Sequence, residues 1–407
     1  MKIFTLLIVI TCFIGQGFSQ TCDYVTPKYG FRSTKGIFVG IEKDYQGNDD
    51  SLFIDIYYPV GSVEVKRPLV MWAFGGAFIA GKREDMALTC EECAKRGWVA
   101  ATIDYRIGFE GISILPYDSA EVIRAGFRGA QDGKSALRYL KSRNLEDSID
   151  LGRVWVGGVS AGSIVALATA FFNKDSEKPI EAGNFTIANG RARNDLGSIN
   201  GNRFINGYDT KVQGVFNFFG AVIDVNIIEK GDDIAIFSYH QDLDPVVPCG
   251  HSRPYWTLAG VTERFPYVNG SCLIDPRLTE IGLNEYYHKA WIYKGNQHAV
   301  HNAAEVLKFM LQNANPILCG TVGTHSASKN NLGQIEIYPN PVREKIFLEN
   351  LDNNTSYSIF STNGVVVSKG IAHNSTSIST NQLEEGMYIL QLQKNSSIRN
   401  WKFVKTN

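Results

Sequence analysis

The sequence of 407 residues has little net charge and no long block of like charges. Its 40 Lys and Arg residues are balanced by 41 Asp and Glu residues, which leaves a formal charge of −1 at pH 7. The electrostatic field of a protein with so little net charge is too weak to attract the phosphates of nucleic acid or an anionic membrane surface. We therefore expect no nucleic-acid partner.

The sequence also lacks an uninterrupted apolar run of about 18 residues, the length that a membrane-spanning helix needs. Its one long run, Ile3–Ile14, follows a lysine and precedes the mostly small and polar residues Gly15–Gln20. This is the order of a secretory signal peptide, and a buried first strand is the competing interpretation. We expect residues 1–20 to be removed on export and the mature protein to be soluble, with no transmembrane segment. Neither Cys12 nor Cys22 follows a convincing lipoprotein motif.

Cysteine is scarce, with 7 residues in the chain. Cys12 leaves with the signal peptide, and the even number that remains in an exported protein favours disulfides. Our first candidate pair is Cys249 with Cys272, which bracket a polar loop rich in Pro and Gly. Cys22 and Cys319 flank the main domain and are placed to tie its ends together.

Redox, metal and cofactor chemistry have weak support in the sequence. Cys90 and Cys93 have the C-x-x-C spacing, but they lie on a predicted helix with no strand directly before it and no matching second pair. His240 and His251 are interpreted as loop or strand-end residues without a catalytic role. We therefore expect neither a metal nor a cofactor.

Residues 21–319 alternate between strand-like and helix-like patterns. The runs Pro68–Phe74 and Gly97–Asp104 are apolar throughout and suit strands that are buried on both faces of a parallel sheet. This alternation predicts an α/β fold with a mostly parallel sheet. Further strands are expected at 153–156, 212–219, 234–240 and 289–293, and helices at 85–96, 119–143, 161–172 and 298–312.

Other segments interrupt or follow this alternation. Residues 173–210 are polar and glycine-rich and form an insertion, whereas 108–117 and 249–285 resemble loops or cap elements over the sheet. Residues 320–334 have the small and polar side chains of a linker. From 335 to 407, alternating apolar residues separated by turn signals such as Asn353-Asn354 and Asn363-Gly364 predict a small β-sandwich.

One serine stands among small residues in the segment Gly158-Val-Ser160-Ala-Gly162, which fits the pattern G-x-S-x-G. A strand pattern precedes this segment and a helical pattern follows it, which is the context of a nucleophile on a sharp, strained turn. Glycine on either side avoids collisions with the strand and the helix. We expect Ser160 Oγ to protrude above the carboxyl ends of the strands. An ordinary glycine-rich turn is the alternative.

A nucleophilic serine needs a base that takes its proton and a carboxylate that orients the base. After a later strand, Asp244 directly before Pro-Val-Val-Pro is preferred over Asp242 as the acid. After the last strand, His298 on a short loop that contains Gly295 is preferred over His301 as the base. The two histidines also have the spacing of a metal pair, but no nearby carboxylate has ligand spacing.

An oxyanion formed at the attacked carbonyl needs hydrogen-bond donors already in place, each of which costs about 3 kcal/mol when it is removed. The segment Phe74-Gly-Gly-Ala-Phe78 follows an apolar strand pattern, and its backbone can turn N–H groups toward the serine. We assign the oxyanion hole to the N–H groups of Gly76, Ala77 and Ala161. A plain glycine turn is the alternative for the first two.

These motifs together resemble the α/β-hydrolase superfamily, in particular its esterase and lipase branch with an HGGG-type oxyanion loop. The resemblance covers about residues 36–318 and includes Pro68–Gly81, Gly97–Arg106 and Ala130–Lys141. It implies a mostly parallel central sheet flanked by helices, a Ser-His-Asp triad and no cofactor.

Three residues depart from that branch. Phe74 stands where many relatives carry His, Ala77 where many carry a third Gly, and Ser163 where Gly is frequent. Ala77 keeps its N–H, so we expect the oxyanion hole to survive, with the methyl group narrowing the pocket. The insertion after Phe172 has no familiar counterpart and leaves the acyl pocket unassigned.

The C-terminal segment resembles the type IX secretion sorting domain of Bacteroidetes. The resemblance rests on Pro-Asn-Pro within Ile337–Val342, Asn-Gly within Tyr357–Gly364 and Gly-Met-Tyr within Leu383–Gln391, in that order. It implies a contact with the type IX secretion machinery and export through the outer membrane, followed by release or anchoring at the cell surface. A carbohydrate-binding sandwich is the alternative, but no exposed aromatic row supports it.

The sequence thus predicts an exported serine hydrolase that cleaves carboxylic esters through an acyl-enzyme. Small-molecule esters and acetyl or feruloyl groups on polysaccharides are the substrates that the resemblance suggests. A peptidase of the prolyl-oligopeptidase type shares the triad but usually brings a propeller, for which this chain is short. A non-catalytic binding protein on the same scaffold, such as a cholinesterase-like adhesion protein, typically lacks a triad member.

Overall fold

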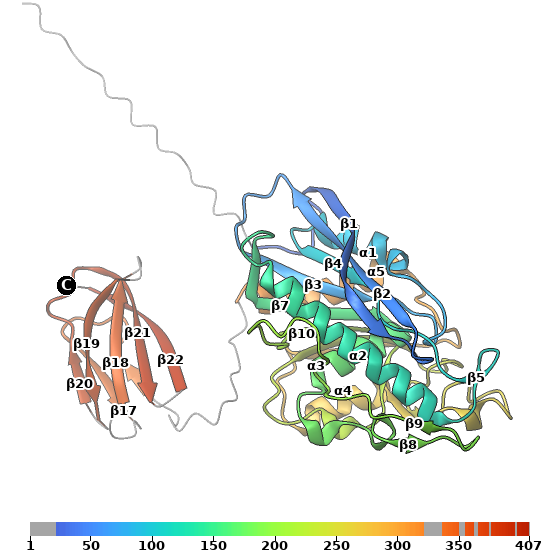
Figure 1. The fold of residues 1–407 in the computed structure, drawn as a ribbon. Helices are drawn as coiled ribbons and strands as arrows, with labels where there is room; N and C mark the ends of the chain where they lie inside the picture. Colours follow the sequence, from blue (N-terminus) through green and yellow to red (C-terminus); the bar gives the residue numbers. More distant parts are fainter. Residues whose placement is uncertain are drawn as a thin grey trace, which may run out of the picture. The chain divides into compact units, whose positions relative to one another are not determined.

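The computed structural model describes residues 22–320, 336–349, 355–361, 365–373, 376–394 and 397–406. By its contacts the chain divides into two units, Met1–His325 and Ser326–Asn407 (Figure 1). The expected signal peptide and nearly all of the expected linker lie outside the described residues.

An eight-stranded sheet organises the first unit, in the order β1-β2-β4-β3-β7-β10-β12-β15. Strand β2 runs antiparallel to both of its neighbours, and every other adjacent pair is parallel. The mostly parallel sheet with helices on both faces confirms the predicted α/β-hydrolase fold. The strands span Gly30–Lys43 (β1), Asp49–Val60 (β2), Arg67–Ala73 (β3), Val99–Ile103 (β4), Ile149–Val159 (β7), Gly214–Phe218 (β10), Ala235–Gln241 (β12) and His288–Tyr293 (β15).

Helices cover both faces of this sheet. Helices α2 (Ser119–Ser142) and α3 (Ala161–Phe171) pack together on one face, and α1 (Ala87–Ala94) and α5 (Ala303–Leu318) lie on the other (Figure 1). Within the described ranges, no helix combines the length and the hydropathy of a bilayer-spanning segment.

Helix α5 begins five residues later than the sequence pattern predicts. The side chain of Asn302 accepts hydrogen bonds from the N–H groups of Ala304 and Glu305, which makes it the N-cap. The preceding residues, with His298 among them, consequently stay in a loop.

Short elements fill the segments between these strands and helices. The segment 249–285, expected to hold loops or cap elements, contains helix α4 (Ser271–Glu280). The other short strands are β5 (Gly111–Ile112), β6 (Leu115–Pro116), β8 (Phe185–Thr186), β9 (Ala192–Arg193), β11 (Ala221–Val222), β13 (His251–Ser252) and β14 (Val268–Gly270). The 3-10 turns are η1 (Arg83–Met86), η2 (Asp175–Glu177), η3 (Ile180–Ala182), η4 (Val225–Ile227) and η5 (Thr262–Arg264).

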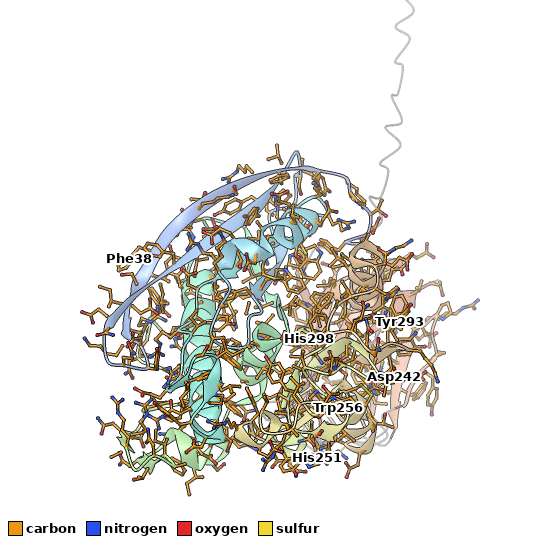
Figure 2. All side chains as sticks on the ribbon, turned by 90° about the vertical axis from the view of Figure 1, so that its right-hand side faces the viewer. Phe38, Asp242, His251, Trp256, Tyr293 and His298 are labelled. Atoms are coloured by element: carbon orange, nitrogen blue, oxygen red, sulfur yellow. A yellow bond between two sulfur atoms is a disulfide. The ribbon has the colours of Figure 1, made fainter. Side chains whose placement is uncertain are left out.

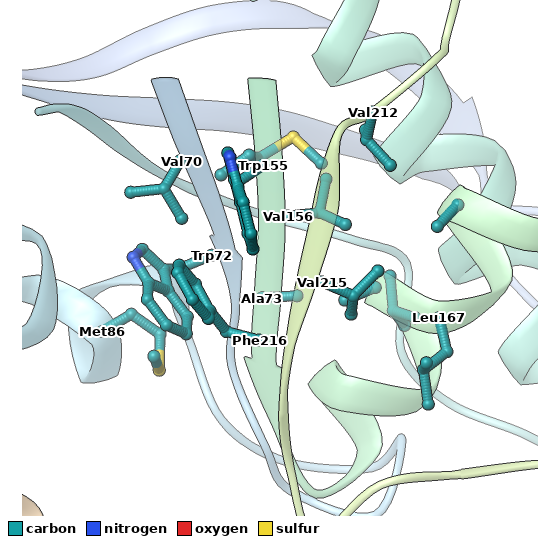
Figure 3. Packing of buried hydrophobic residues seen from close by; sticks show 14 of the residues in the cluster. Val70, Trp72, Ala73, Met86, Trp155, Val156, Leu167, Val212, Val215 and Phe216 are labelled. Carbon is teal, nitrogen blue, oxygen red and sulfur yellow. The ribbon is translucent and has the colours of Figure 1, made fainter. Parts of the chain in front are cut away.

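Aromatic side chains fill the centre of the core. Trp72 of β3 stacks on Phe216 of β10 with ring centroids 5.7 Å apart, and Phe216 stacks on Trp155 of β7 at 4.8 Å. Figure 3 shows Trp72 and Phe216 on the side of Met86, whereas Leu167 of α3 lies on the opposite face of the sheet. Because helices and side chains bury both faces of the sheet, the sequences of these strands are apolar throughout.

The insertion 173–210 is held along α2 by long polar side chains of that helix. Arg124, Gln131 and Arg138 are each nearly buried and donate to backbone carbonyl oxygens of the insertion. Arg124 donates to the carbonyl oxygens of Glu181, Gly183 and Asn194. Gln131 donates to those of Leu196 and Ser198. Arg138 donates to those of Asn200, Arg203 and Phe204. The helix thereby satisfies carbonyl groups of a segment that has little secondary structure of its own.

Both candidate disulfides are confirmed. Cys22 bonds to Cys319 across 297 residues, and Cys249 bonds to Cys272 across 23. Cys90 and Cys93 are free, buried thiols on α1. No group of three or more His, Cys, Asp or Glu side chains in the described part of the chain is arranged to hold a metal ion.

The second unit consists of antiparallel strands in two sheets, which confirms the predicted all-β domain. The sheets have the orders β16-β17-β20 and β19-β18-β21-β22. Alternate residues such as Ile359, Leu390 and Leu392 are fully buried between them. The expected turns at 353–354 and 363–364 lie outside the described residues. The strands span Glu336–Tyr338 (β16), Lys345–Glu349 (β17), Thr355–Ser361 (β18), Val366–Ala372 (β19), Thr376–Ser379 (β20), Gly386–Lys394 (β21) and Ser397–Lys405 (β22).

We expect the two disulfides to stabilise the first unit unequally. Replacing both Cys22 and Cys319 by Ser should lower the free energy of unfolding by about 2 kcal/mol more than replacing Cys249 and Cys272, because the longer crosslink removes more entropy from the unfolded chain. Urea unfolding of the two double variants beside the native protein measures this difference. Equal losses, or a larger loss for the shorter crosslink, would contradict it.

Candidate active site

Ser160 occupies the turn between β7 and α3 with φ 56° and ψ −122°. A residue with a side chain rarely adopts positive φ, and such a conformation costs about 1–3 kcal/mol. The neighbouring positions admit only glycine: a Cβ on Gly158 would collide with the carbonyl group of Gly162, and a Cβ on Gly162 would collide with the carbonyl oxygen of Ala73. The turn therefore has the strained backbone that the sequence predicts.

The structure brings Ser160, His298 and Asp244 together at the carboxyl ends of β7, β12 and β15. His298 Nε2 lies 2.7 Å from Ser160 Oγ, and His298 Nδ1 lies 2.7 Å from Asp244 Oδ2. A carboxylate oxygen only accepts, so Nδ1 carries the proton and Nε2 is free to accept from the serine hydroxyl. His298 lies in the loop between β15 and α5 and is labelled in Figure 2.

Asp244 is nearly inaccessible to solvent, and backbone donors orient it. Its Oδ1 accepts from the N–H groups of Val246 at 2.8 Å and Val247 at 3.1 Å, which leaves Oδ2 for His298. The alternative acid, Asp242, accepts from the N–H of Gly295 at 2.9 Å and so shapes the loop before His298. Asp244, and not Asp242, is thus the carboxylate that contacts the His298 imidazole.

Further side chains hold the loop that carries His298. Gln241 accepts from the N–H of Gln297 at 2.8 Å and donates to the carbonyl oxygen of Ala299 at 2.8 Å. The alternative base, His301, contacts the Tyr239 hydroxyl at 2.9 Å. His301 also stacks on the ring of Tyr293, at 4.2 Å between centroids, in the packing between β12, β15 and α5.

The proposed oxyanion loop has an unusual backbone. Gly76, Ala77 and Phe78 have φ values of 129°, 53° and 63°. The N–H groups of Gly76 and Ala77 have no hydrogen-bond acceptor within the described residues, and Ala161 is the first residue of α3, where an N–H has no partner inside the helix. These three N–H groups are therefore free to bind a ligand, and the loop approaches Ser160 at Gly75, where an added Cβ would lie 3.4 Å from Ser160 Cβ.

Tyr105 supports this loop, and sequence reasoning missed it. Its hydroxyl donates to the carbonyl oxygen of Phe74 at 2.8 Å, and the two rings stack with centroids 4.4 Å apart. Phe74, at the position where relatives carry His, is buried in this contact. The Asp-Tyr-Arg sequence that follows β4 was a signal for Tyr105. Only the fold shows that its partner is Phe74.

His240 is a fully buried neighbour of Asp244, with its Nε2 3.6 Å from Asp244 Oδ2. Nε2 donates to the carbonyl oxygen of Val247 at 2.9 Å, so Nδ1 accepts from Ser271 Oγ at 2.9 Å. Burial lowers the pKa of His240 to about 4, against the raising effects of the Val247 hydrogen bond and the Asp244 charge. The imidazole is therefore neutral at physiological pH.

A chain of buried polar groups continues from this histidine to α3, the helix that follows Ser160. Asn217 Nδ2 donates to Ser271 Oγ at 3.1 Å, and Asn217 Oδ1 accepts from Ser163 Oγ at 2.6 Å. Ser163 thus uses the hydroxyl that distinguishes it from the glycine of related sequences. The network joins the first turn of α3 to the loop that carries Asp244.

We expect His240 to make the protein sensitive to acid. Unfolded His has a pKa of about 6.5, and the folded value is about 4. Between these pH values the unfolded chain binds a proton that the folded chain does not. The free energy of unfolding should therefore fall as the pH is lowered through this window, by about 3 kcal/mol more than in a His240→Gln variant.

Urea unfolding at about pH 7 and about pH 4 compares the native protein with this variant. The variant should be less stable near neutrality, because it removes hydrogen bonds to Val247 and Ser271, and the difference should shrink in acid. A difference that stays constant between the two pH values would show that His240 does not titrate in this way.

Two family models match segments of this chain. Residues 54–242 match the family BD-FAE, and residues 336–406 match the family described as a secretion system C-terminal sorting domain. The first match contains the oxyanion loop and Ser160, and the second covers the antiparallel sheets of the second unit.

Curated relatives match shorter segments. Bile salt-activated lipase of Bos taurus is 32% identical over 129 residues, which cover 28% of this chain and 21% of the lipase. Fumonisin B1 esterase of Sphingopyxis macrogoltabida is 29% identical over 118 residues, which cover 28% of this chain and 22% of that esterase. The chain thus spans about a fifth of the length of these relatives.

Among solved structures, the propionate-bound Est2 esterase of Thermogutta terrifontis shares 16% identity, covers 70% of this chain and 96% of its own, and has a TM-score of 0.45. The sheet topology shows that the first unit has the α/β-hydrolase fold, and its residues 54–242 are similar to the family BD-FAE. The match over residues 336–406 identifies the second unit as a secretion sorting domain, which directs the protein to secretion or to the cell surface.

Proposed function

We propose that this protein hydrolyses carboxylic esters through an acyl-enzyme, with Ser160, His298 and Asp244 as its catalytic triad. The observation that carries the proposal is the pair of 2.7 Å hydrogen bonds from the serine hydroxyl to the imidazole and from the imidazole to the carboxylate. The lipases and esterases among the relatives support an ester substrate.

In the first half of the reaction, Ser160 Oγ attacks the ester carbonyl carbon while His298 Nε2 takes the hydroxyl proton. The N–H groups of Gly76, Ala77 and Ala161 stabilise the tetrahedral oxyanion. The Asp244 carboxylate stabilises the imidazolium through Nδ1. When the intermediate collapses, the bond from the carbonyl carbon to the alcohol oxygen breaks, and His298 gives its proton to the leaving alcohol.

In the second half, water replaces the alcohol. His298 takes a proton from the water molecule, whose oxygen attacks the acyl carbon bound to Ser160. Collapse of the second tetrahedral intermediate breaks the bond to Oγ, releases the carboxylic acid and returns the proton to the serine. None of these steps needs a cofactor.

The biological substrates that we propose are esters on polysaccharides, with acetyl or feruloyl groups as the acyl component. The sorting domain supports an extracellular or surface location, where polymers that do not enter the cell are accessible. The match to BD-FAE over residues 54–242 supports an esterase rather than a peptidase.

Replacing Ser160 by Ala should abolish ester hydrolysis, because the attacking atom is lost. We expect kcat for nitrophenyl acetate to fall by about five to six orders of magnitude, as it does when a triad serine is removed elsewhere. A fluorophosphonate probe should label the native protein and leave the variant unlabelled. Comparable turnover by the variant would exclude this nucleophile, and an unlabelled native protein would favour a non-catalytic scaffold.

The neighbouring carboxylates offer a matched pair of variants. Asp244→Asn should lower kcat by about 10⁴-fold, because an amide no longer selects the imidazole tautomer or stabilises the imidazolium. Asp242→Asn should retain most of the activity, since its carboxylate only accepts from the Gly295 N–H. Kinetics with nitrophenyl acetate compare the two. A larger loss in Asp242→Asn would reverse the assignment of the acid.

A further inference from the structure

An apolar pocket lies between α2, α3, β11 and the oxyanion loop. Phe78 of the loop, Gly126 of α2, Ile164 of α3 and Val222 of β11 line it, and Pro179 of the insertion closes one side. All of its lining residues are apolar or glycine. The pocket therefore offers no side-chain partner to a charged or hydroxylated group.

The walls of the pocket continue directly from the proposed catalytic segments. Phe78 follows Ala77, the second oxyanion donor, and the N–H of Ile164 donates to the Ser160 carbonyl oxygen at 3.1 Å. The ring of Phe219 packs against the ring of His298, with centroids 4.7 Å apart. Val222, three residues further along the chain, lines the pocket. The pocket is thus lined by residues that follow closely in sequence on Ala77 and Ser160.

The orientation of the triad decides which half of an ester this pocket can take. His298 Nε2 must reach the leaving oxygen, so the alcohol lies on the His298 side. None of the described residues that line the pocket comes from the loop 294–302, which carries His298. Phe78 and Ile164 instead follow oxyanion donors, which places the pocket on the acyl side.

The cavity volume is about 50 Å³, roughly a third of the ~150 Å³ apolar cavity that binds benzene in another protein. An aromatic acyl group does not fit this space, whereas a short aliphatic chain does. Pro179 cannot easily withdraw, because the insertion that carries it is tied to α2 by the carbonyl contacts of Arg124, Gln131 and Arg138.

We propose that this pocket binds the acyl group of the ester and selects short aliphatic acyl groups, from acetyl to butanoyl, over longer and aromatic ones. The proposal rests on the ester hydrolysis proposed above, of which it names the acyl specificity. Of the two acyl groups proposed for a polysaccharide substrate, the pocket therefore favours acetyl over feruloyl.

Two variants change the pocket in opposite directions. Gly126 faces Phe78, and a Cβ there would lie 3.6 Å from its ring, an ordinary contact, so Gly126→Val narrows the space without a clash at that atom. Ile164→Ala widens it. Leu145→Ala is the control, because Leu145 is exposed and lies before the start of β7, whose opposite end leads to Ser160.

The test measures kcat/KM for nitrophenyl acetate, butanoate and octanoate, for methyl ferulate, and for methyl and phenyl acetate, which vary the alcohol at a constant acetyl group. The native protein should prefer the acetate and butanoate. Gly126→Val should lower butanoate hydrolysis by about 10-fold with little change for acetate, and Ile164→Ala should raise octanoate hydrolysis by about 10-fold. Leu145→Ala should change neither ratio. Melting temperatures identify a variant that fails to fold. Gly126→Ala then replaces Gly126→Val, and Val222→Ala replaces Ile164→Ala.

Several outcomes would overturn the proposal while leaving ester hydrolysis intact. These are unchanged chain-length ratios in both pocket variants, a native preference for methyl ferulate or octanoate, and a changed preference among alcohols at a constant acetyl group. The last of these would place the alcohol in the pocket. Failure of the proposed function is distinguishable, because the native protein would then hydrolyse none of the esters and would not react with the fluorophosphonate.

Discussion

The strained turn at Ser160 is the constraint around which the site is built. A residue with φ 56° persists only where its surroundings determine its conformation. Here the surroundings are the β7 strand, the first turn of α3 and the oxyanion loop, which approach so closely that Gly158 and Gly162 tolerate no side chain. The same close approach gives the serine hydroxyl, the Ala161 N–H and the loop a common space.

Buried polar groups connect this turn with the other catalytic loops. The network from Ser163 through Asn217 and Ser271 reaches His240, which lies beside Asp244. In a low-dielectric interior, hydrogen bonds of this kind are strong when every member is satisfied. The loop that carries Asp244 is thereby positioned against α3, the helix that follows Ser160, although the two are far apart in sequence.

Helix α2 links the stability of the fold to the shape of the site. Its buried arginines bind the backbone of the insertion, and its Gly126 faces the oxyanion loop across the apolar pocket. A segment with little secondary structure of its own can therefore contribute a wall to a pocket. The helix had been recognisable from its pattern, but its polar residues gave no indication of what they bind.

Local sequence patterns were sufficient to predict the structure where the interacting residues are near in sequence or where the fold allows only one arrangement. The apolar runs identified the buried strands, G-x-S-x-G identified the strained turn, and the positions of Cys22 and Cys319 at the ends of the domain indicated their disulfide. The start of α5 was misplaced, because a single cap at Asn302 outweighed the helical pattern before it.

Tertiary structure alone decided the rest. Asp242 and Asp244 are two residues apart and chemically identical, and only the fold directs Asp244 toward His298 and Asp242 toward Gly295. The partners of Tyr105 and His240, and the pocket itself, likewise depend on groups brought together from distant segments. Composition and spacing reveal which side chains are able to react, whereas the distances on which reaction depends are set by how the strands and loops pack.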